Sequence, residues 1–483
     1  MDIETFLSSE KSMIIAPAGY GKTYTIAEAI AAYQGGKRVL VLTHTHAGVA
    51  SLREKITQKD IPPSSYQIDT ICSFALELTR VYHIKKDDFP LADNVNDFFK
   101  FAVEHAITIL RAKPIQKLLE IEYEHLIVDE YQDCTMLQHQ MILQLASIIK
   151  THILGDPLQG IFEFRDSLIG FNDTSLIPFR RNCQTLNTPW RWNNAGNNRL
   201  GKELSLIRNK LQRNEDIDLN DYHSIEFLKA PETDYTKPHS QYKHLIFNAL
   251  NDNSVLLIHP RCESVEFRLN YVRQFPQLRL IESIDDKAYY EFCDAFDGLT
   301  GQNLISKTVE VMRKIATTTG INRWFNKQNT LINKRNIEDK AIKDSLAATI
   351  ASLSSQKTYG EIANLMEKIQ NLPDVKVYRK DFLHDLCSVL READRLGLTA
   401  RLSIERNRNI LRRKGRKIQG KGIGTTLLTK GLEFDTVVIL NAHQFEDPKH
   451  LYVALTRCSK RLVIISQTNI LHPYKETLPE ELF

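Results

Sequence analysis

Residues 16–23, AlaProAlaGlyTyrGlyLysThr, place two glycines, a lysine and a threonine at a spacing that suits a phosphate chain. Gly19 and Gly21 allow backbone N–H groups to turn inward around phosphate oxygens. Lys22 can neutralise the terminal phosphates, and the Thr23 hydroxyl can ligate Mg²⁺. A glycine-containing turn in an ordinary domain is the other interpretation, but the stretch predicts a P-loop. The residues predicted to bind the nucleotide here are Pro17, Ala18, Gly19, Tyr20, Gly21, Lys22, Thr23 and Tyr24.

Two adjacent carboxylates, Asp129 and Glu130, directly follow the apolar run 125–128. At the end of a buried strand, the first carboxylate can hold Mg²⁺ through its water shell, and the second can take a proton from the attacking water. A solvated acidic turn is the alternative interpretation. Together with the P-loop, the pair predicts a nucleoside triphosphatase whose Mg²⁺ is held by Thr23 and Asp129.

Alternating strand and helix signals predict the elements that position these residues. Such alternation is typical of βαβ units and a parallel sheet, in which ligands bind at the carboxyl ends of the strands. Lys22, Asp129 and Asp156 should therefore converge at one edge of the sheet. The expected strands are 13–16, 37–43, 124–129 and 151–156, and the expected helices are 24–33 and 47–57.

A second set of strand signals predicts another α/β domain. Two intervals, 76–117 and 296–413, have little clustering of β-branched residues and predict helical insertions. The later strands are expected at 254–259, 425–428, 436–440 and 461–466.

Composition is that of a globular protein: of 483 residues, 42% are hydrophobic and 25% are charged. The seven cysteines are scattered without a CxxC pair, which fits a reducing cytosol and argues against any metal site beyond Mg²⁺. Apolar runs are far shorter than the roughly 20 residues that span a bilayer, so we expect a cytoplasmic protein without a membrane partner.

Five stretches, in order along the chain, carry a family resemblance. They resemble motifs I, II, III, V and VI of the UvrD/Rep branch of superfamily 1 DNA helicases, and this branch commonly has alanine at the position of Ala16. The stretches are AlaProAlaGlyTyrGlyLysThr (16–23), ValAspGluTyrGlnAsp (128–133), LeuGlyAspProLeuGlnGlyIlePhe (154–162), LysGlyLeuGluPheAsp (430–435) and TyrValAlaLeuThrArg (452–457).

The resemblance implies ATP as the nucleotide and further catalytic residues. Gln159 would sense the γ-phosphate or position the attacking water, and Arg457 would act as an arginine finger. Arg191 would be another arginine at the γ-phosphate, and Glu433 would contact the nucleotide sugar or couple the nucleotide to DNA. The implied catalytic set is Lys22, Glu130, Gln159, Arg191 and Arg457.

The resemblance also implies a path for single-stranded DNA. Phe162 and Phe164 would stack on bases next to Arg165, although both aromatics could instead be core residues. The other implied DNA-binding residues are Thr43, His44, Thr45, Thr70 and Ser73.

A basic run lies just before the fourth motif. Residues 401–421 hold nine basic residues and one acid. They could form a track for phosphates, or they could be the solvated face of a helix.

The fold implied by the resemblance is α/β, with two RecA-like P-loop NTPase domains that have parallel sheets and each carry a small, mainly helical insertion. The expected segments are domain 1A at 1–76 and 119–185, insertion 1B at 77–118, domain 2A at 186–295 and 414–483, and insertion 2B at 296–413.

The implied function is that of an ATP-dependent DNA helicase or translocase that moves 3′ to 5′ on single-stranded or tailed duplex DNA. The compact chain also resembles the helicase subunit of Gabija-type anti-phage systems, in which a helicase accompanies a nuclease. A regulatory, DNA-sensing ATPase subunit that unwinds little by itself is therefore the main alternative. A P-loop protein that acts on RNA is a third hypothesis.

Overall fold

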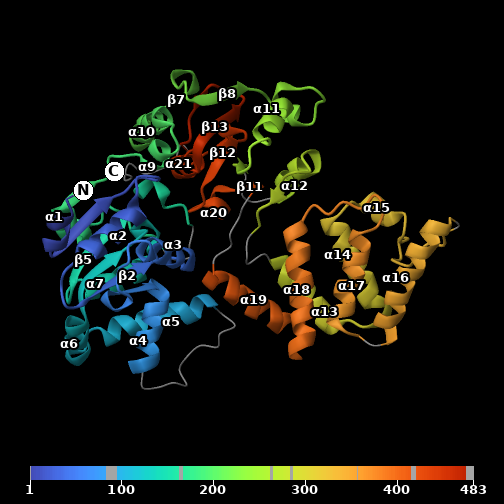
Figure 1. The fold of residues 1–483 in the computed structure, drawn as a ribbon, viewed down its shortest axis with the longest axis horizontal. Coiled ribbons are helices and arrows are strands. Elements are labelled where there is room, and N and C mark those ends of the chain that lie inside the picture. Colours follow the sequence, from blue (N-terminus) through green and yellow to red (C-terminus); the bar gives the residue numbers. More distant parts are fainter. Residues whose placement is uncertain are drawn as a thin grey trace. The chain divides into compact units, whose positions relative to one another are not determined.

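The computed structural model describes residues 2–82, 95–162, 167–260, 265–282, 287–334, 336–355, 357–414 and 420–474. The chain divides into two compact units (Figure 1). Unit 1 comprises Met1–Glu232 and Lys430–Phe483, and unit 2 comprises Thr233–Thr429. This division does not test the predicted domain segments, whose boundaries stay a prediction.

A six-stranded parallel sheet forms the first part of unit 1. Its spatial order is β3-β2-β4-β5-β1-β6, so β5 lies between β4 and β1. The central strands are apolar runs that are buried along their length, as expected where both faces of a parallel sheet are covered. The strands are β1 (Lys11–Ile15), β2 (Arg38–Thr43), β3 (Tyr66–Thr70), β4 (Tyr123–Val128), β5 (Lys150–Gly155) and β6 (Cys183–Thr185).

The helices of this part share the core of the sheet. Phe74 and Val103, from the segment expected as insertion 1B and its border, are buried in one cluster with Leu42 and Leu126 of the strands. This segment is helical in its described residues, as predicted. The helices are α1 (Ile3–Ser8), α2 (Lys22–Ala32), α3 (His46–Thr57), α4 (Ile71–Tyr82), α5 (Val95–Ile109), α6 (Lys113–Glu122), α7 (Met136–Leu145) and α8 (Ile177–Arg180).

The rest of unit 1 contains three more parallel strands, in the order β12-β13-β8. Two short strands, β7 and β14, pair antiparallel. These strands are β7 (Ile217–Asp218), β8 (Ile225–Lys229), β12 (Phe434–Ile439), β13 (Cys458–Ser466) and β14 (Ile470–Leu471). The helices are α9 (Trp190–Asn194), α10 (Asn198–Gln212) and α21 (Pro448–Leu455).

Unit 2 contains a parallel array in the order β10-β11-β9. The predicted strand at 425–428 is wrong, because these residues lie mainly in helix α20 (Thr426–Thr429) and the strand β11 (Lys421–Gly424) precedes it. A Cβ on Gly422 would lie 2.9 Å from Ile281 Cδ1, so this strand uses glycine for close packing rather than the β-branched residues that the prediction sought. The other elements are α11 (Gln241–Ala249), β9 (Val255–Ile258), α12 (Val265–Gln274) and β10 (Arg279–Leu280).

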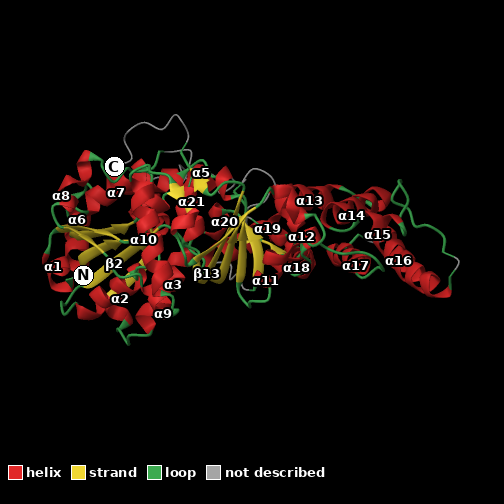
Figure 2. Cartoon of the chain, turned by 90° about the horizontal axis from the view of Figure 1, so that it is seen from above, coloured by secondary structure: helices red, strands yellow, loops and turns green. Residues whose placement is uncertain are grey.

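The second part of unit 2 has a helical core of its own, and its described residues form helices without strands (Figure 2). Helix α18 shows why: Phe382, Leu386 and Val389 are buried at helical spacing, and Gly397 ends the helix in the left-handed conformation. The helices are α13 (Lys287–Gly298), α14 (Gly301–Ile315), α15 (Thr318–Asn322), α16 (Ile337–Ser355), α17 (Tyr359–Gln370), α18 (Lys380–Leu396) and α19 (Ala400–Lys414).

The basic run 401–421 begins on α19, where two of its arginines contact other side chains of the protein. The Arg408 guanidinium lies 3.8 Å from the centre of the Tyr289 ring and is buried. Arg401 forms an ion pair with Glu405 at 2.7 Å. These contacts favour the structural interpretation for these two arginines, and the phosphate track stays a prediction.

Two features are absent from the part of the chain that the structure describes. No helix there is both long and apolar enough to cross a bilayer. No cluster of three or more His, Cys, Asp or Glu side chains there is arranged to hold a metal ion.

Two buried histidines connect neighbouring strands in the first sheet. Ser12 Oγ lies 2.8 Å from His152 Nδ1, and His152 Nε2 lies 3.0 Å from His125 Nδ1. Burial, followed by the field of Lys150, lowers the pKa of His125 to about 4. Burial, followed by the field of His125, lowers the pKa of His152 to about 3. Both rings are therefore neutral at pH 7.

The two histidines should make the protein less stable in mild acid. In the unfolded chain their pKa is about 6.5. The stability that the two neutral, buried rings contribute is therefore complete above that pH and is lost as pH falls toward 4. At pH 5.5 each histidine should lower the free energy of unfolding by about 1.4 kcal/mol relative to pH 7.5. Urea unfolding at the two pH values measures this loss, which His152→Gln should reduce. The exposed His223→Gln is the control, and equal pH dependence in all three proteins would contradict the prediction.

Candidate functional site

The P-loop follows β1 and leads into the N-terminus of α2. Gly19 has φ +77° and Gly21 has φ +86°, a region that favours glycine. A Cβ on Gly19 would lie 3.0 Å from Arg191 Cβ, and one on Gly21 would lie 3.0 Å from Trp190 Cδ1. Both glycines are thus required by backbone conformation and by the close approach of α9. The turn and the start of α2 offer the N–H groups that a phosphate chain needs.

The Lys22 ammonium lies between the two predicted carboxylates. Its Nζ is 2.6 Å from Glu130 Oε1 and 3.1 Å from Asp129 Oδ1. Burial acts to raise the pKa of Glu130, but the fields of Lys22 and Lys430 outweigh it and lower the pKa to about 2. Burial raises the pKa of Asp129 against the opposing field of Lys22. Lys22 therefore acts on both carboxylates.

Glu130 has a backbone conformation that is costly for a residue with a side chain. Its φ is +54°, in the left-handed region, and its N–H donates to Asp129 Oδ1 at 2.9 Å. Such a conformation costs on the order of 1–3 kcal/mol and persists where surrounding contacts impose it, often at functional sites. It directs the two neighbouring carboxylates to one lysine.

Gln132 links the acid pair to the end of β5. Its amide nitrogen donates to Glu130 Oε2 at 2.5 Å, and its amide oxygen accepts the Asp156 N–H at 3.0 Å. The predicted catalytic Gln159 is buried and donates to Asp156 Oδ2 at 3.1 Å. Asp156 also forms a buried ion pair with Arg208 at 2.8 Å. Lys22, Asp129 and Asp156 thus belong to one site, as predicted.

Later segments of the chain contribute to this site within unit 1. Arg191 Nε lies 2.7 Å from Glu433 Oε2, and Arg191 also donates to the Thr456 carbonyl. The Tyr452 hydroxyl accepts the Ala18 N–H of the P-loop at 3.2 Å. Sequence reasoning assigned no role to Tyr452, although it lies in the last motif.

Arg457 lies in the same region but is held by its own segment. Its guanidinium donates to the carbonyls of Val453 at 2.9 Å and Leu432 at 3.3 Å, and to the Thr456 hydroxyl at 3.1 Å. Burial, followed by the field of Arg191, lowers the pKa of Arg457 to about 10. Arg457 is thus a buried cation with three partners within residues 432–456.

A buried ion pair joins the second and fourth motifs. Lys430 Nζ lies 2.6 Å from Asp133 Oδ2 and donates to the Gln159 carbonyl at 2.5 Å. The exposed fractions of the two side chains are 8% and 2%. Burial raises the pKa of Asp133 to about 7, although Lys430 opposes this shift. Neither residue was predicted as part of the site.

Phe162 lies beside this ion pair and is half-buried. Lys430 Nζ is 4.5 Å from the centre of its ring, and the His44 ring stacks on it with centroids 6.3 Å apart. Burial, with a smaller effect of Lys430, lowers the pKa of His44 to about 4, so the ring is neutral. Phe164 and Arg165 lie outside the described residues.

The other predicted DNA-binding residues lie at the ends of β2 and β3. Thr43 ends β2 and is buried, and Thr45 caps α3 by accepting the Gly48 N–H. The Thr70 hydroxyl donates to Ser73 Oγ at 2.8 Å. These residues share the carboxyl edge of the sheet with the acid pair.

The remaining predicted nucleotide residues differ in exposure. Tyr20 is buried and its hydroxyl contacts Ser205 of α10, whereas Tyr24 is 56% exposed and its ring lies below the Lys59 ammonium. Pro17 is buried and Thr23 is half-buried.

Arg208, which sequence reasoning missed, gave no signal because it lies on an amphipathic helix far from any motif.

Comparisons with known proteins agree with the geometry. Residues 2–165 match the AAA domain family. The chain is 23% identical over 414 residues to the Gabija protein GajB of Bacillus cereus (strain VD045), covering 80% of this chain and 72% of that protein.

Two solved structures are among those similar to this chain. The Pif1 helicase from Candida albicans has a TM-score of 0.41 and 12% identity, covering 96% of this chain and 93% of that one. The Pif1 helicase from Bacteroides in complex with ADP-AlF3 and ssDNA has a TM-score of 0.40 and 14% identity, covering 99% and 93%.

The P-loop, the acid pair and the AAA domain match are those of an ATP hydrolase, and the five motifs resemble those of superfamily 1 helicases. Within this class, the chain resembles the Gabija protein GajB.

Replacing Lys22 or Glu130 should abolish ATP turnover. Lys22→Ala removes the buried ammonium and Glu130→Gln removes the expected proton acceptor, so each should lower turnover at least about 100-fold. Phosphate release in the presence of single-stranded DNA measures the effect. The exposed Lys55→Ala on α3 serves as the control and should keep wild-type activity. Retained hydrolysis in either site variant would contradict the roles assigned to them.

Breaking the Lys430–Asp133 pair should destabilise unit 1. Lys430→Met leaves a buried carboxylate without its partner and should cost about 3–5 kcal/mol of unfolding free energy. Adding Asp133→Leu should restore most of the loss, because no buried charge then remains unpaired. Denaturant unfolding measures both. Lys460→Met, from an exposed pair with Asp435, is the control and should cost less than about 1 kcal/mol.

Proposed function

We propose that the protein is an ATP-driven translocase that moves 3′ to 5′ on single-stranded DNA and separates tailed duplexes. The observation that carries the proposal is the contact of Lys22 with Asp129 and Glu130, at a P-loop that later segments also reach through Arg191 and Tyr452.

The residues fit a magnesium-bound nucleotide. The chemistry of the donor set supports this: two carboxylates lie against Lys22, the Thr23 hydroxyl follows it in the chain, and the preceding turn has two glycines in the left-handed conformation. Thr23 and Asp129 would hold the Mg²⁺, which would offset the charge of the phosphates. Lys22 would neutralise the terminal phosphates. Its transfer from Glu130 to a phosphate would raise the basicity of that carboxylate, which would then accept the proton of the attacking water.

The arginines would connect hydrolysis to movement. Arg191 is bound by Glu433, and Arg457 is bound by three groups of its own segment. To stabilise charge on a transferring phosphoryl group, either guanidinium would exchange these partners for phosphate oxygens. That exchange requires residues 430–457 to shift relative to the P-loop. Gln159, next to Asp156, would position the attacking water.

The DNA would pass the carboxyl edge of the first sheet. The half-buried Phe162 would offer its ring for base stacking, with Phe164 and Arg165 beyond it. Its contact with Lys430, which binds Asp133, supports a link between the DNA and the acid pair. Thr43, His44, Thr45, Thr70 and Ser73 would contact the DNA strand.

The second candidate is a DNA-sensing ATPase subunit that works with a nuclease in an anti-phage complex. Similarity to the Gabija protein GajB favours it. In that role the same site would hydrolyse ATP, whereas unwinding by the isolated chain would be weak.

Arg457→Ala should separate nucleotide binding from turnover. We expect nucleotide affinity to change less than about threefold while turnover falls at least about 100-fold, because the guanidinium would act on transition-state charge. Fluorescent nucleotide binding and phosphate release measure the two effects. Arg461→Ala, from a partly exposed pair with Glu226, is the control. An equal loss of affinity and turnover would contradict an arginine finger.

A strand-displacement assay separates the two candidate functions. The isolated chain should unwind a 3′-tailed duplex with ATP, and a matched 5′-tailed duplex should remain paired. DNA-stimulated hydrolysis without unwinding would instead support the regulatory subunit, and a nuclease among co-purifying proteins would identify its context. Stronger stimulation by RNA than by DNA would contradict both.

A further inference from the structure

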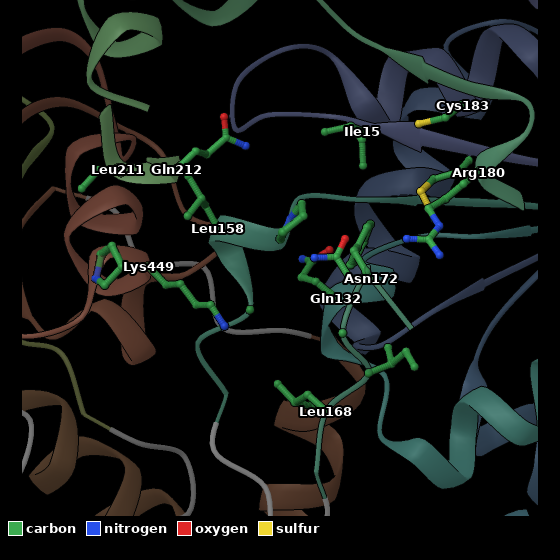
Figure 3. Close-up of a pocket in the computed structure, with 17 residues that line it drawn as sticks. Ile15, Gln132, Leu158, Leu168, Asn172, Arg180, Cys183, Leu211, Gln212 and Lys449 are labelled. Carbon is green, nitrogen blue, oxygen red and sulfur yellow. The ribbon is translucent and has the colours of Figure 1, made fainter. Parts of the chain in front are cut away.

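A pocket of about 550 Å³ in unit 1 is lined in part by Gln132, whose amide donates to Glu130 of the acid pair (Figure 3). Its wall is mainly apolar and includes Leu158, Phe171 and Leu211. A volume in this range is typical of sites for small organic molecules.

The charged side chains that line the pocket have one sign. Arg180 and Lys449 line it, and no Asp or Glu occurs among the described lining residues. Arg180 donates to the Asp173 carbonyl at 3.3 Å, but neither cation forms an ion pair with a residue that the structure describes. Figure 3 shows the two side chains on opposite sides of the view, with Gln132 and Asn172 between them. The pocket therefore suits a molecule with an apolar body and an anionic group.

The pocket shares a wall with the catalytic residues. Gln132 and the segment from Pro157 to Gly160 line it. The amide of Gln132 donates to Glu130, and Gln159 lies within that segment. Lys449 belongs to α21, which also carries Tyr452, the partner of the P-loop. A ligand in the pocket would thus contact supports of the acid pair, of Gln159 and of the P-loop.

We propose that this pocket is a regulatory site for a small amphipathic organic anion, and that its occupancy slows ATP turnover. The ligand class is an apolar, ring-containing body with one carboxylate, sulfonate or phosphate. Both Arg180 and Lys449 would attract the anion, and the body would pack against Phe171 and Leu158. Filling the pocket would restrict the movement of α21, which belongs to the segment 430–457 that would shift during turnover, and would contact residues 157–160 beside it. The regulatory half of the proposal rests on the proposed ATPase cycle, whereas binding does not.

Binding can be measured with 1-anilinonaphthalene-8-sulfonate, whose fluorescence rises in an apolar site. Its affinity for the full chain should fall about tenfold in Arg180→Gln and in Lys449→Gln, because each removes a charged hydrogen-bond donor. Arg181→Gln, an exposed neighbour, should bind like the wild type. The uncharged analogue N-phenyl-1-naphthylamine should bind more weakly and should not distinguish these variants.

Cys183 locates the bound probe. This cysteine is exposed in the pocket wall, and the other described cysteines are buried or half-buried. The sulfonate should slow alkylation of Cys183 by iodoacetamide, read by peptide mass spectrometry. Gly170→Leu should lower the affinity for the sulfonate, because the added side chain narrows the pocket. The fold should tolerate the change, since a Cβ at this position meets no atom within 4 Å.

The outcomes separate binding from regulation. Equal affinity in Arg180→Gln, Lys449→Gln and the wild type, or unprotected Cys183, would overturn the site. If binding follows the prediction but the saturating sulfonate leaves the ATPase rate unchanged, the regulatory role is overturned. A lower rate in the wild type that is absent in Lys449→Gln supports both. A chain without any ATPase activity would refute the proposed function and the regulatory role, while the fluorescence result would still decide the site.

Discussion

The contact between the Lys22 ammonium and the carboxylates of Asp129 and Glu130 is the interaction on which unit 1 depends. Three charges lie close together in a largely buried site, and each would be costly without the others. Their meeting requires β4 and β1 to end at the same edge of the sheet, with β5 between them. The parallel sheet satisfies this requirement, because its strands end together where the P-loop begins.

The same site is tied to segments that lie more than 270 residues away in sequence. Lys430 reaches Asp133, and Tyr452 reaches the P-loop backbone at Ala18. These contacts use buried charge and a buried hydroxyl, so they are costly to break without replacement partners. In the proposed function, a phosphate chain would supply such partners for Lys22 and the arginines. Binding of the nucleotide and the position of residues 430–457 would then be linked by competition for the same groups.

The sequence predicted the central strands well, because both faces of a parallel sheet are covered and the strands become short apolar runs. The expected ranges 37–43, 124–129 and 151–156 match β2, β4 and β5 within one residue at each end. β3 was missed because Tyr66–Thr70 contains polar residues and gives no apolar run. β11 was misplaced because two of its four residues are glycines, whose strand conformation is imposed by the neighbouring strands β9 and β10.

The sequence by itself determined the nucleotide chemistry. This chemistry depends on local patterns: glycines that permit the left-handed turn, a lysine for phosphate, and adjacent carboxylates after a strand. Only the tertiary structure decided which distant groups support them. Gln132, Arg208, Lys430 and Tyr452 act through contacts between residues 24 to 434 positions apart. The physical reason is that buried hydrogen bonds and ion pairs depend on how elements pack, whereas a turn or a strand depends on its own residues.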